Sequence, residues 1–334
     1  YDNIGNVLTM TYPGNKTVTY TYDAVNNLKT VTDWNNQTTS YYYRSDGQLD
    51  YMIYPNNVKT VYTYDEAGRP TGISTKRNNG NGTAIAEYTF ALDPLGNHTQ
   101  ESIIEQYTAY PNIPSATINY SYNNANRIQT AGNISFGFDN NGNTTSKTGY
   151  TYAYDILNNL TSVSGSFTAS YVYDGAGNRR EATRNGVVTK YVLDILGISN
   201  VLMETDGSGT PQNYYVYGLG LISRIKPNNT THYYVYDYRG STVAITDATT
   251  SANVTHKYQY DDFGKVLQLE EADYNPFRYV GKYGVIYEND ELQFMRARYY
   301  DPTIGRFLSE DPIWSTNLYP YTDNNPIINI DPKG

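Results

Sequence analysis

The chain has 334 residues, of which 39 are tyrosine, and only 17% are charged, whereas a typical globular chain is about a quarter charged. Tyr, Thr, Asn and Gly form helices weakly, so this composition argues against a helical protein. The absence of cysteine excludes disulfides, zinc–thiolate sites and a cysteine nucleophile, and the net charge of −9 argues against nucleic acid as a partner. No apolar run reaches the ~18 residues that a membrane span needs.

A short repeat runs along the chain from its first residue. Each copy is an aromatic strand that ends in Tyr-Asp, followed by two residues, then Gly or Asn, a polar residue and an apolar one. Clear copies are Tyr1–Leu8, Tyr22–Leu28, Tyr64–Pro70, Tyr154–Leu160, Tyr173–Arg179, Tyr236–Thr242 and Tyr260–Val266, and degenerate copies begin at residues 43, 92, 122, 138 and 193. Because the chain starts inside a copy, we expect it to be a piece of a longer polypeptide.

The repeat predicts a β-hairpin. Residues 17–22 alternate with the period of two that is typical of a half-buried strand. The Tyr-Asp-x-x-Gly-Asn segment predicts a turn, because Asp bonds forward to backbone N–H groups and Gly or Asn accepts a positive φ. Since one hairpin cannot bury its own face, we expect the copies to stack into one extended sheet with tyrosine ladders. The tyrosine rings would pack while their hydroxyls stay solvated.

The Tyr-Asp pairs admit two interpretations. They could bind ligands, with aromatic faces for sugars and carboxylates for a metal, or they could be turn and ladder scaffolding. Their recurrence in about a dozen places favours scaffolding. His98, His232 and His256 lie in separate copies without metal-ligand spacing, so we expect ordinary surface or strand residues and neither a metal nor a cofactor.

Over its whole length the chain resembles YD-repeat, or RHS-repeat, proteins. From Tyr214 onward it is similar to the RHS-repeat-associated core domain, which suggests a division into repeats (1–213) and core domain (214–334). The ordered motifs that carry this resemblance are Tyr214–Ile222, Tyr233–Ser241, Asn275–Lys282, Arg296–Pro302, Gly305–Pro312, Asn317–Tyr321 and Asn324–Gly334.

The resemblance implies an all-β fold in which the repeat sheet spirals into a hollow shell, closed by a C-terminal plug. Related shells occur in bacterial polymorphic toxins, Tc-type toxins and teneurins. They enclose a C-terminal, often toxic, polypeptide of the same precursor, and many members cut the chain just after an Asp-Pro-x-Gly motif. The implied location is secreted or cell-surface, and the implied partners are that cargo and further repeat segments or copies of the chain.

The resemblance assigns the self-cleavage to Asp311 and Asp331, with Gly334 as the last residue before the cut. Two adjacent carboxylates cannot both ionise cheaply, so such a pair can act as acid and base on a water molecule. Taken alone, an Asp-Pro pair is a turn signal. The enzyme activity expected is at most that of an aspartyl-type autoprotease acting on its own chain.

Arg306 matches an arginine that is implicated in members of the family. It would hold a carboxylate or the scissile carbonyl, or else form a buried ion pair that fixes the plug. Residues 313–317, which follow Asp311, form a shorter connection toward Asp331 than in many members of the family. A shorter connection could change how the two carboxylates come together. Two alternatives to encapsulation remain open: a structural or adhesive surface protein without catalysis, and a sugar-binding module that uses exposed tyrosines.

Overall fold

A computed structural model describes every residue except 108, 113–116, 289–291 and 314–315. The described residues form strands and three short 3-10 helices, and they contain no helix long and apolar enough to cross a membrane. The chain divides into two compact units. The first contains residues 1–110, 213–259 and 268–283, and the second contains residues 111–212, 260–267 and 284–334.

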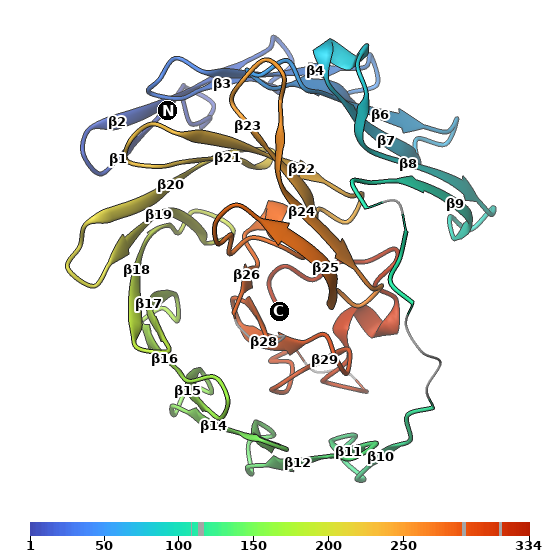
Figure 1. Cartoon of the computed structure of the whole chain (residues 1–334), viewed down its shortest axis with the longest axis vertical. Coiled ribbons are helices and arrows are strands. Elements are labelled where there is room, and N and C mark those ends of the chain that lie inside the picture. Colours follow the sequence, from blue (N-terminus) through green and yellow to red (C-terminus); the bar gives the residue numbers. More distant parts are fainter. Residues whose placement is uncertain (108, 113–116, 289–291, 314–315) are drawn as a thin grey trace. The chain divides into compact units, whose positions relative to one another are not determined.

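The first unit contains a nine-stranded antiparallel sheet whose strands pair in chain order (Figure 1). Its strands are β1 (Thr9–Tyr12), β2 (Lys16–Tyr22), β3 (Leu28–Thr32), β4 (Thr38–Tyr43), β5 (Leu49–Ile53), β6 (Lys59–Tyr64), β7 (Pro70–Lys76), β8 (Ala84–Leu92) and β9 (His98–Ile104). Helix η1 (Asn78–Gly80) connects β7 to β8, and helix η2 (Gly281–Tyr283) ends the unit.

Later hairpins of the repeat complete the first unit. They are formed by β20 (Pro211–Gly218), β21 (Gly220–Ile225), β22 (Thr231–Tyr236), β23 (Thr242–Asp247) and β24 (Val254–Tyr260). The boundaries between the units fall inside β20, β24 and β25 (Val266–Glu271), so the first two residues of β20 and the last residue of β24 belong to the second unit.

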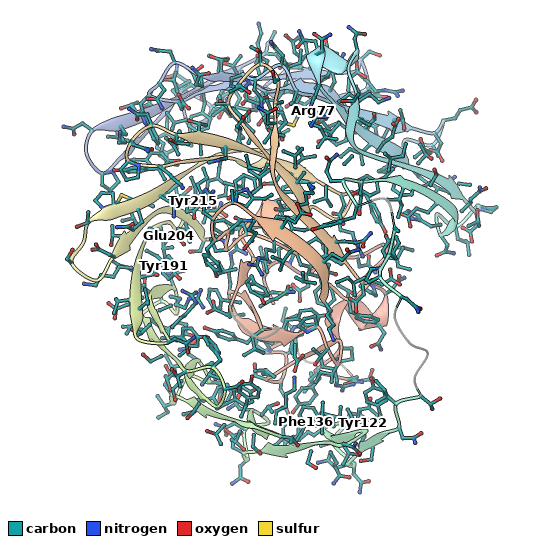
Figure 2. All side chains as sticks on the ribbon, in the orientation of Figure 1. Arg77, Tyr122, Phe136, Tyr191, Glu204 and Tyr215 are labelled. Atoms are coloured by element: carbon teal, nitrogen blue, oxygen red, sulfur yellow. The ribbon has the colours of Figure 1, made fainter. Side chains whose placement is uncertain are left out.

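The second unit has the same hairpin pattern in its first half. Its strands pair in chain order as β10 (Tyr120–Tyr122), β11 (Ile128–Ala131), β12 (Ile134–Phe138), β13 (Thr144–Lys147), β14 (Tyr150–Tyr154), β15 (Leu160–Ser164), β16 (Ala169–Tyr173), β17 (Arg179–Arg184), β18 (Val187–Asp194) and β19 (Asn200–Asp206). Across the last pair, Tyr191 in β18 lies opposite Glu204 in β19 (Figure 2).

The repeat gives way to a small separate sheet in residues 284–334. Its strands are β26 (Ile286–Tyr287), β27 (Gln293–Met295), β28 (Arg298–Asp301) and β29 (Arg306–Phe307), and helix η3 (Tyr321–Asn324) follows. Aromatic side chains form its core: Tyr300 and Tyr321 have rings 4.5 Å apart and are both 0% exposed. The predicted division at residue 213 remains a prediction.

The predicted turn chemistry is confirmed. In the turn that begins at Asp23, one carboxylate oxygen accepts the backbone N–H groups of Val25 and Asn27 at 3.0 and 2.8 Å, and Asn26 adopts a φ of 74°. The pKa of Asp23 lies below its ordinary value, and the largest cause is the hydrogen bond from the backbone N–H group of Asn27. The turn that begins at Asp65 has the same arrangement. These carboxylates are therefore structural groups of the turn, which favours the scaffolding interpretation.

The expectation that the tyrosine hydroxyls stay solvated is wrong for five of the tyrosines that directly precede a turn. Each of these five hydroxyls donates to the backbone carbonyl oxygen that begins the return strand of the preceding hairpin. The bonds run from Tyr22 to Val7, Tyr43 to Leu28, Tyr64 to Leu49, Tyr173 to Leu160 and Tyr236 to Leu221, at 2.8–3.1 Å. The tyrosine thus ties neighbouring hairpins together, because a half-buried hydroxyl needs a partner once its water is lost.

Candidate functional site

The last four residues, Asp331 to Gly334, lie against the connection between β27 and β28. The N–H group of Ala297 donates to the carbonyl oxygen of Lys333 at 3.0 Å, and the guanidinium of Arg296 donates to that of Pro332 at 2.6 Å. Within the segment, the N–H group of Gly334 donates to the carboxylate of Asp331 at 3.0 Å. These contacts hold the C-terminal segment in one defined conformation.

Arg298, the first residue of β28, joins the two predicted aspartates to the predicted cleavage residue. Its Nη2 donates to Oδ2 of Asp311 at 2.6 Å and lies 3.5 Å from Oδ2 of Asp331. Its Nε donates to the oxygen of Gly334 at 2.7 Å, and its Nη1 donates to the carbonyl oxygen of Leu318 at 2.9 Å. One guanidinium therefore contacts both carboxylates and the carbonyl group that the sequence predicts to be attacked.

The surroundings of Arg298 keep its guanidinium in place. Its side chain is 3% exposed and its guanidinium carbon lies 3.7 Å from the centre of the Phe307 ring. Burial lowers the pKa of Arg298, and Asp311 and Asp331 oppose that effect. The two carboxylates are about one-third exposed, so water can reach them.

Residue 334 has to be glycine in this arrangement. Its φ is +73°, a region that side chains with a Cβ avoid. A Cβ there would overlap the carbonyl oxygen of Met295 and would lie 2.9 Å from the backbone nitrogen of Arg298. Both are backbone atoms, which cannot move aside cheaply, so the glycine lets the chain approach Arg298 closely.

Arg306 lies in the same unit, but its described hydrogen bonds go to other groups. Its Nη2 donates to the carbonyl oxygen of Asn126 at 3.0 Å and to Oδ1 of Asn317 at 3.2 Å, and its backbone forms a bridge with Pro320. Arg306 thereby fixes the stretch that includes Leu318, whose carbonyl oxygen Arg298 contacts. Its predicted contact with a carboxylate or the scissile carbonyl stays a prediction. Trp314 and Ser315 of the shorter connection lie outside the described residues.

Sequence reasoning missed Arg298 as a site residue. The motif that contains it, Arg296–Pro302, carries two arginines and is part of the resemblance, but nothing in the motif distinguishes one arginine from the other. The structure separates them by their partners: Arg296 donates to backbone oxygens and to an amide oxygen, whereas Arg298 contacts both carboxylates.

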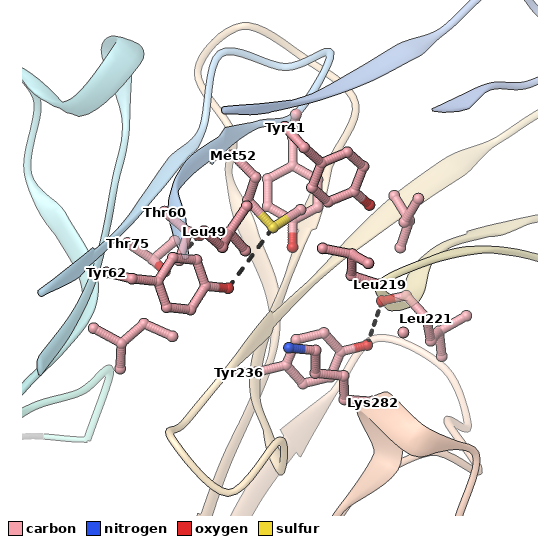
Figure 3. Close-up of a pocket in the computed structure, with 14 residues that line it drawn as sticks. Tyr41, Leu49, Met52, Thr60, Tyr62, Thr75, Leu219, Leu221, Tyr236 and Lys282 are labelled. Atoms are coloured by element: carbon pink, nitrogen blue, oxygen red, sulfur yellow. Dashed lines mark hydrogen bonds between the residues drawn. The ribbon is translucent and has the colours of Figure 1, made fainter. Parts of the chain in front are cut away.

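Other candidate sites are weaker. In the first unit, a cavity of about 20 Å³ is lined by Tyr41, Met52, Tyr62 and Tyr236, with the Lys282 side chain beside them (Figure 3). That volume holds about one water molecule and no larger ligand. Burial lowers the pKa of Lys282 to about 8.

The three histidines lie in strands, as expected. The described residues contain no group of three His, Asp or Glu side chains that could hold a metal ion. His256 is fully buried, and its Nε2 lies 2.9 Å from the carboxylate of Asp273, which also accepts from Arg224. This cluster satisfies buried polar groups within the first unit.

Comparison with known proteins identifies the family. A family profile described as the teneurin YD-shell matches residues 76–329, and one described as the RHS repeat matches residues 1–43. The chain belongs to the teneurin YD-shell family. The predicted family and the predicted all-β shell fold are therefore confirmed, although the YD-shell match ends two residues before Asp331.

Two curated relatives are similar in sequence, and a solved structure shares the fold. The tRNA3(Ser)-specific nuclease WapA of Bacillus spizizenii and the tRNA nuclease WapA of Bacillus subtilis are both 34% identical to the chain over 277 residues. These residues are 78% of this chain but 11% of each relative, so the chain spans about a tenth of their length. Among solved structures, a Photorhabdus luminescens Tc holotoxin pore with a TccC3 mutation matches this YD-shell chain with a TM-score of 0.72 and 18% sequence identity. The match covers 100% of this chain and 21% of the matched toxin chain.

Proposed function

We propose that this YD-shell chain forms wall and plug segments of a hollow shell, which encloses a toxin-like C-terminal polypeptide of the same precursor. We further propose that the plug releases this cargo by cutting the precursor after Gly334. Residues 1–213 would serve as wall and residues 214–334 as core domain and plug, in a protein that is secreted or carried on the cell surface. The WapA and Tc relatives, whose names are those of nucleases and toxins, support a role in toxin carriage.

The single observation that carries the cleavage proposal is the contact of Arg298 with Asp311, Asp331 and the oxygen of Gly334. In an uncut precursor this oxygen is the carbonyl oxygen of the peptide bond to be cut. A buried guanidinium at 2.7 Å can stabilise the negative charge that develops on that oxygen during attack.

The proposed reaction is a hydrolysis in which Asp311 and Asp331 act as a pair. One carboxylate takes a proton from a water molecule, whose oxygen bonds to the carbonyl carbon of Gly334. The bond from that carbon to the next nitrogen then breaks, and the leaving amine receives a proton from the pair. Because the two groups share one guanidinium, we assign the acid and base roles to the pair as a whole. Arg306 acts as a positioning residue through the stretch at Asn317.

The test is to express the chain together with the natural residues that follow Gly334. The unmodified protein should yield a fragment that ends at Gly334, whereas Asp311→Asn and Asp331→Asn should each leave the chain intact with unchanged circular dichroism. Arg298→Lys should slow cleavage by about tenfold to a thousandfold, because the lysine cannot contact all three groups at once. Cleavage at the unmodified rate in both aspartate variants would rule out the proposed pair.

A structural or adhesive role without catalysis is the second candidate. One edge of the nine-stranded sheet is β9, whose residues 99–104 are all exposed, with Ile104 51% exposed. An exposed edge of this kind can pair with another chain. If this role works by self-assembly, it predicts concentration-dependent assemblies in light scattering, and a single monomeric species at all concentrations would exclude self-assembly through this edge.

A further inference from the structure

A groove in the second unit opens beside the candidate site. Its volume is about 650 Å³, within the range that is typical of ligand pockets. On one side it is lined by Arg298, Asp311 and Lys333, which belong to or adjoin the candidate site. On the other side it is lined by turns of the repeat hairpins, including Ala176 and Asn178.

The sequence of three neighbouring turns shapes this groove. The hairpins β14–β15, β16–β17 and β18–β19 follow one another in the sheet, so their turns lie along the same edge. The outer two turns carry large apolar side chains, whereas the middle turn reads Asp174-Gly-Ala-Gly-Asn178 and carries none. The small residues of the middle turn leave the space that the groove occupies.

The apolar side chains of the outer turns are unusually exposed. Ile156 and Leu157 are 94% and 68% exposed, and Ile195 and Leu196 are 63% and 60% exposed. Leu157 also lines the groove. Several large apolar side chains gathered on neighbouring turns favour a surface that another polypeptide segment covers.

We propose that this groove holds the first residues after Gly334 in the uncut precursor. The proposal rests on the proposed cleavage function and adds the binding site for the leaving segment. The next residue is bonded to the carbonyl carbon whose oxygen contacts Arg298, and Arg298 and Asp311 both line the groove. The side-chain amides that line the groove can bond to the backbone of an extended segment, and its apolar side chains can contact Leu157, Ile198 and Pro312, which line the groove as well.

The first experiment fills the groove and measures cleavage of the extended chain. Ala176 is exposed at the tip of its turn, so Ala176→Trp should place an indole in the groove without disturbing the hairpin. We expect cleavage to slow by about tenfold to a hundredfold, because a misplaced scissile bond reacts poorly. The matched control is Ala67→Trp, at the same position of a turn in the first unit. Equal rates for both variants would overturn the proposal.

The second experiment does not depend on cleavage. Since the chain has no cysteine, Ala176→Cys can be combined with a cysteine at the second residue after Gly334 in an extended chain that carries Asp331→Asn. A short bismaleimide should link the two cysteines within one chain, and Ala67→Cys should give no link. If no link formed at Ala176, the proposed binding of the leaving segment in the groove would be refuted, even if the unmodified chain is cleaved. If the link formed but the unmodified chain was not cleaved, the proposed cleavage would be refuted, whereas the binding of the segment in the groove would be supported.

Discussion

The ion cluster around Glu288 allows a quantitative prediction for the packing of residues 284–334 in the second unit. The carboxylate of Glu288 is 0% exposed and accepts four hydrogen bonds. Arg179 donates to it at 2.6 Å, Arg184 at 2.7 and 2.9 Å, and the hydroxyl of Tyr171 at 3.1 Å. The three donors come from β16 and β17, whereas Glu288 follows β26, so the cluster ties the stretch after β26 to the repeat sheet of the second unit.

The substitution Glu288→Gln removes the charge and turns an NH₂ group toward these donors. The side chain of Arg179 is 1% exposed, so its charge would be left buried without a carboxylate. Breaking a buried pair in this way costs about 3–5 kcal/mol. The pKa of Glu288 gives a similar figure: burial alone raises it, but Arg179 and Arg184 bring it down to about 2, from the ordinary 4.5. That difference corresponds to about 3 kcal/mol.

The assay is urea unfolding of both proteins between pH 7 and pH 2. Because the pKa is lowered in the folded state, this stabilisation is complete above pH 4.5 and is lost as the pH falls toward 2. The difference between Glu288→Gln and the unmodified chain should therefore be largest at pH 7 and shrink in acid. Replacing the whole cluster by Arg179→Met, Arg184→Leu and Glu288→Leu should recover most of the loss. A cost below about 1 kcal/mol at pH 7 would refute this reasoning.

Three further predictions concern single residues. Tyr64→Phe removes the hydrogen bond from the hydroxyl to Leu49 and should lower the free energy of unfolding in urea by about 1 kcal/mol. Tyr42→Phe, at an exposed ring, should leave that free energy nearly unchanged. Equal losses in the two variants would contradict the role of the Tyr64 hydroxyl in joining neighbouring hairpins. Lys282→Met should raise the free energy of unfolding by about 1–2 kcal/mol at pH 7, because the fold disfavours the charged form of the lysine. The gain should shrink toward pH 10, because the unmodified chain recovers stability as its lysine loses the proton above pH 8. A gain that does not depend on pH would contradict this reasoning. Gly334→Ala should abolish cleavage of the extended chain in a gel assay, and cleavage at the unmodified rate would show that the close approach to Arg298 is not needed.

The local structure could be predicted from the sequence because its causes are local. The carboxylate of Asp23 bonds to N–H groups two and four residues ahead, and Asn26 takes the positive φ that the turn requires. The hydroxyl of Tyr64 was misjudged because its acceptor belongs to another hairpin. Its role depends on how neighbouring repeats align in the sheet, which the pattern within one copy does not contain.

The candidate site could be predicted only in part. The resemblance pointed to Asp311, Asp331 and Gly334, and the structure brings all three to one guanidinium. Arg298 could not be found by spacing, because its partners lie 13 to 36 residues further along the chain. The groove could not be predicted either, since it arises from a small turn between two large ones and from the position of the C-terminal segment beside them.

The measurement that tests the central claim most directly is the mass of the products formed when the extended chain folds in heavy-oxygen water. Hydrolysis by the aspartate pair predicts a fragment that ends at Gly334 and carries one heavy oxygen in its new carboxylate, at a rate independent of protein concentration. An intact chain, or a fragment that ends elsewhere or carries only ordinary oxygen, would contradict the account.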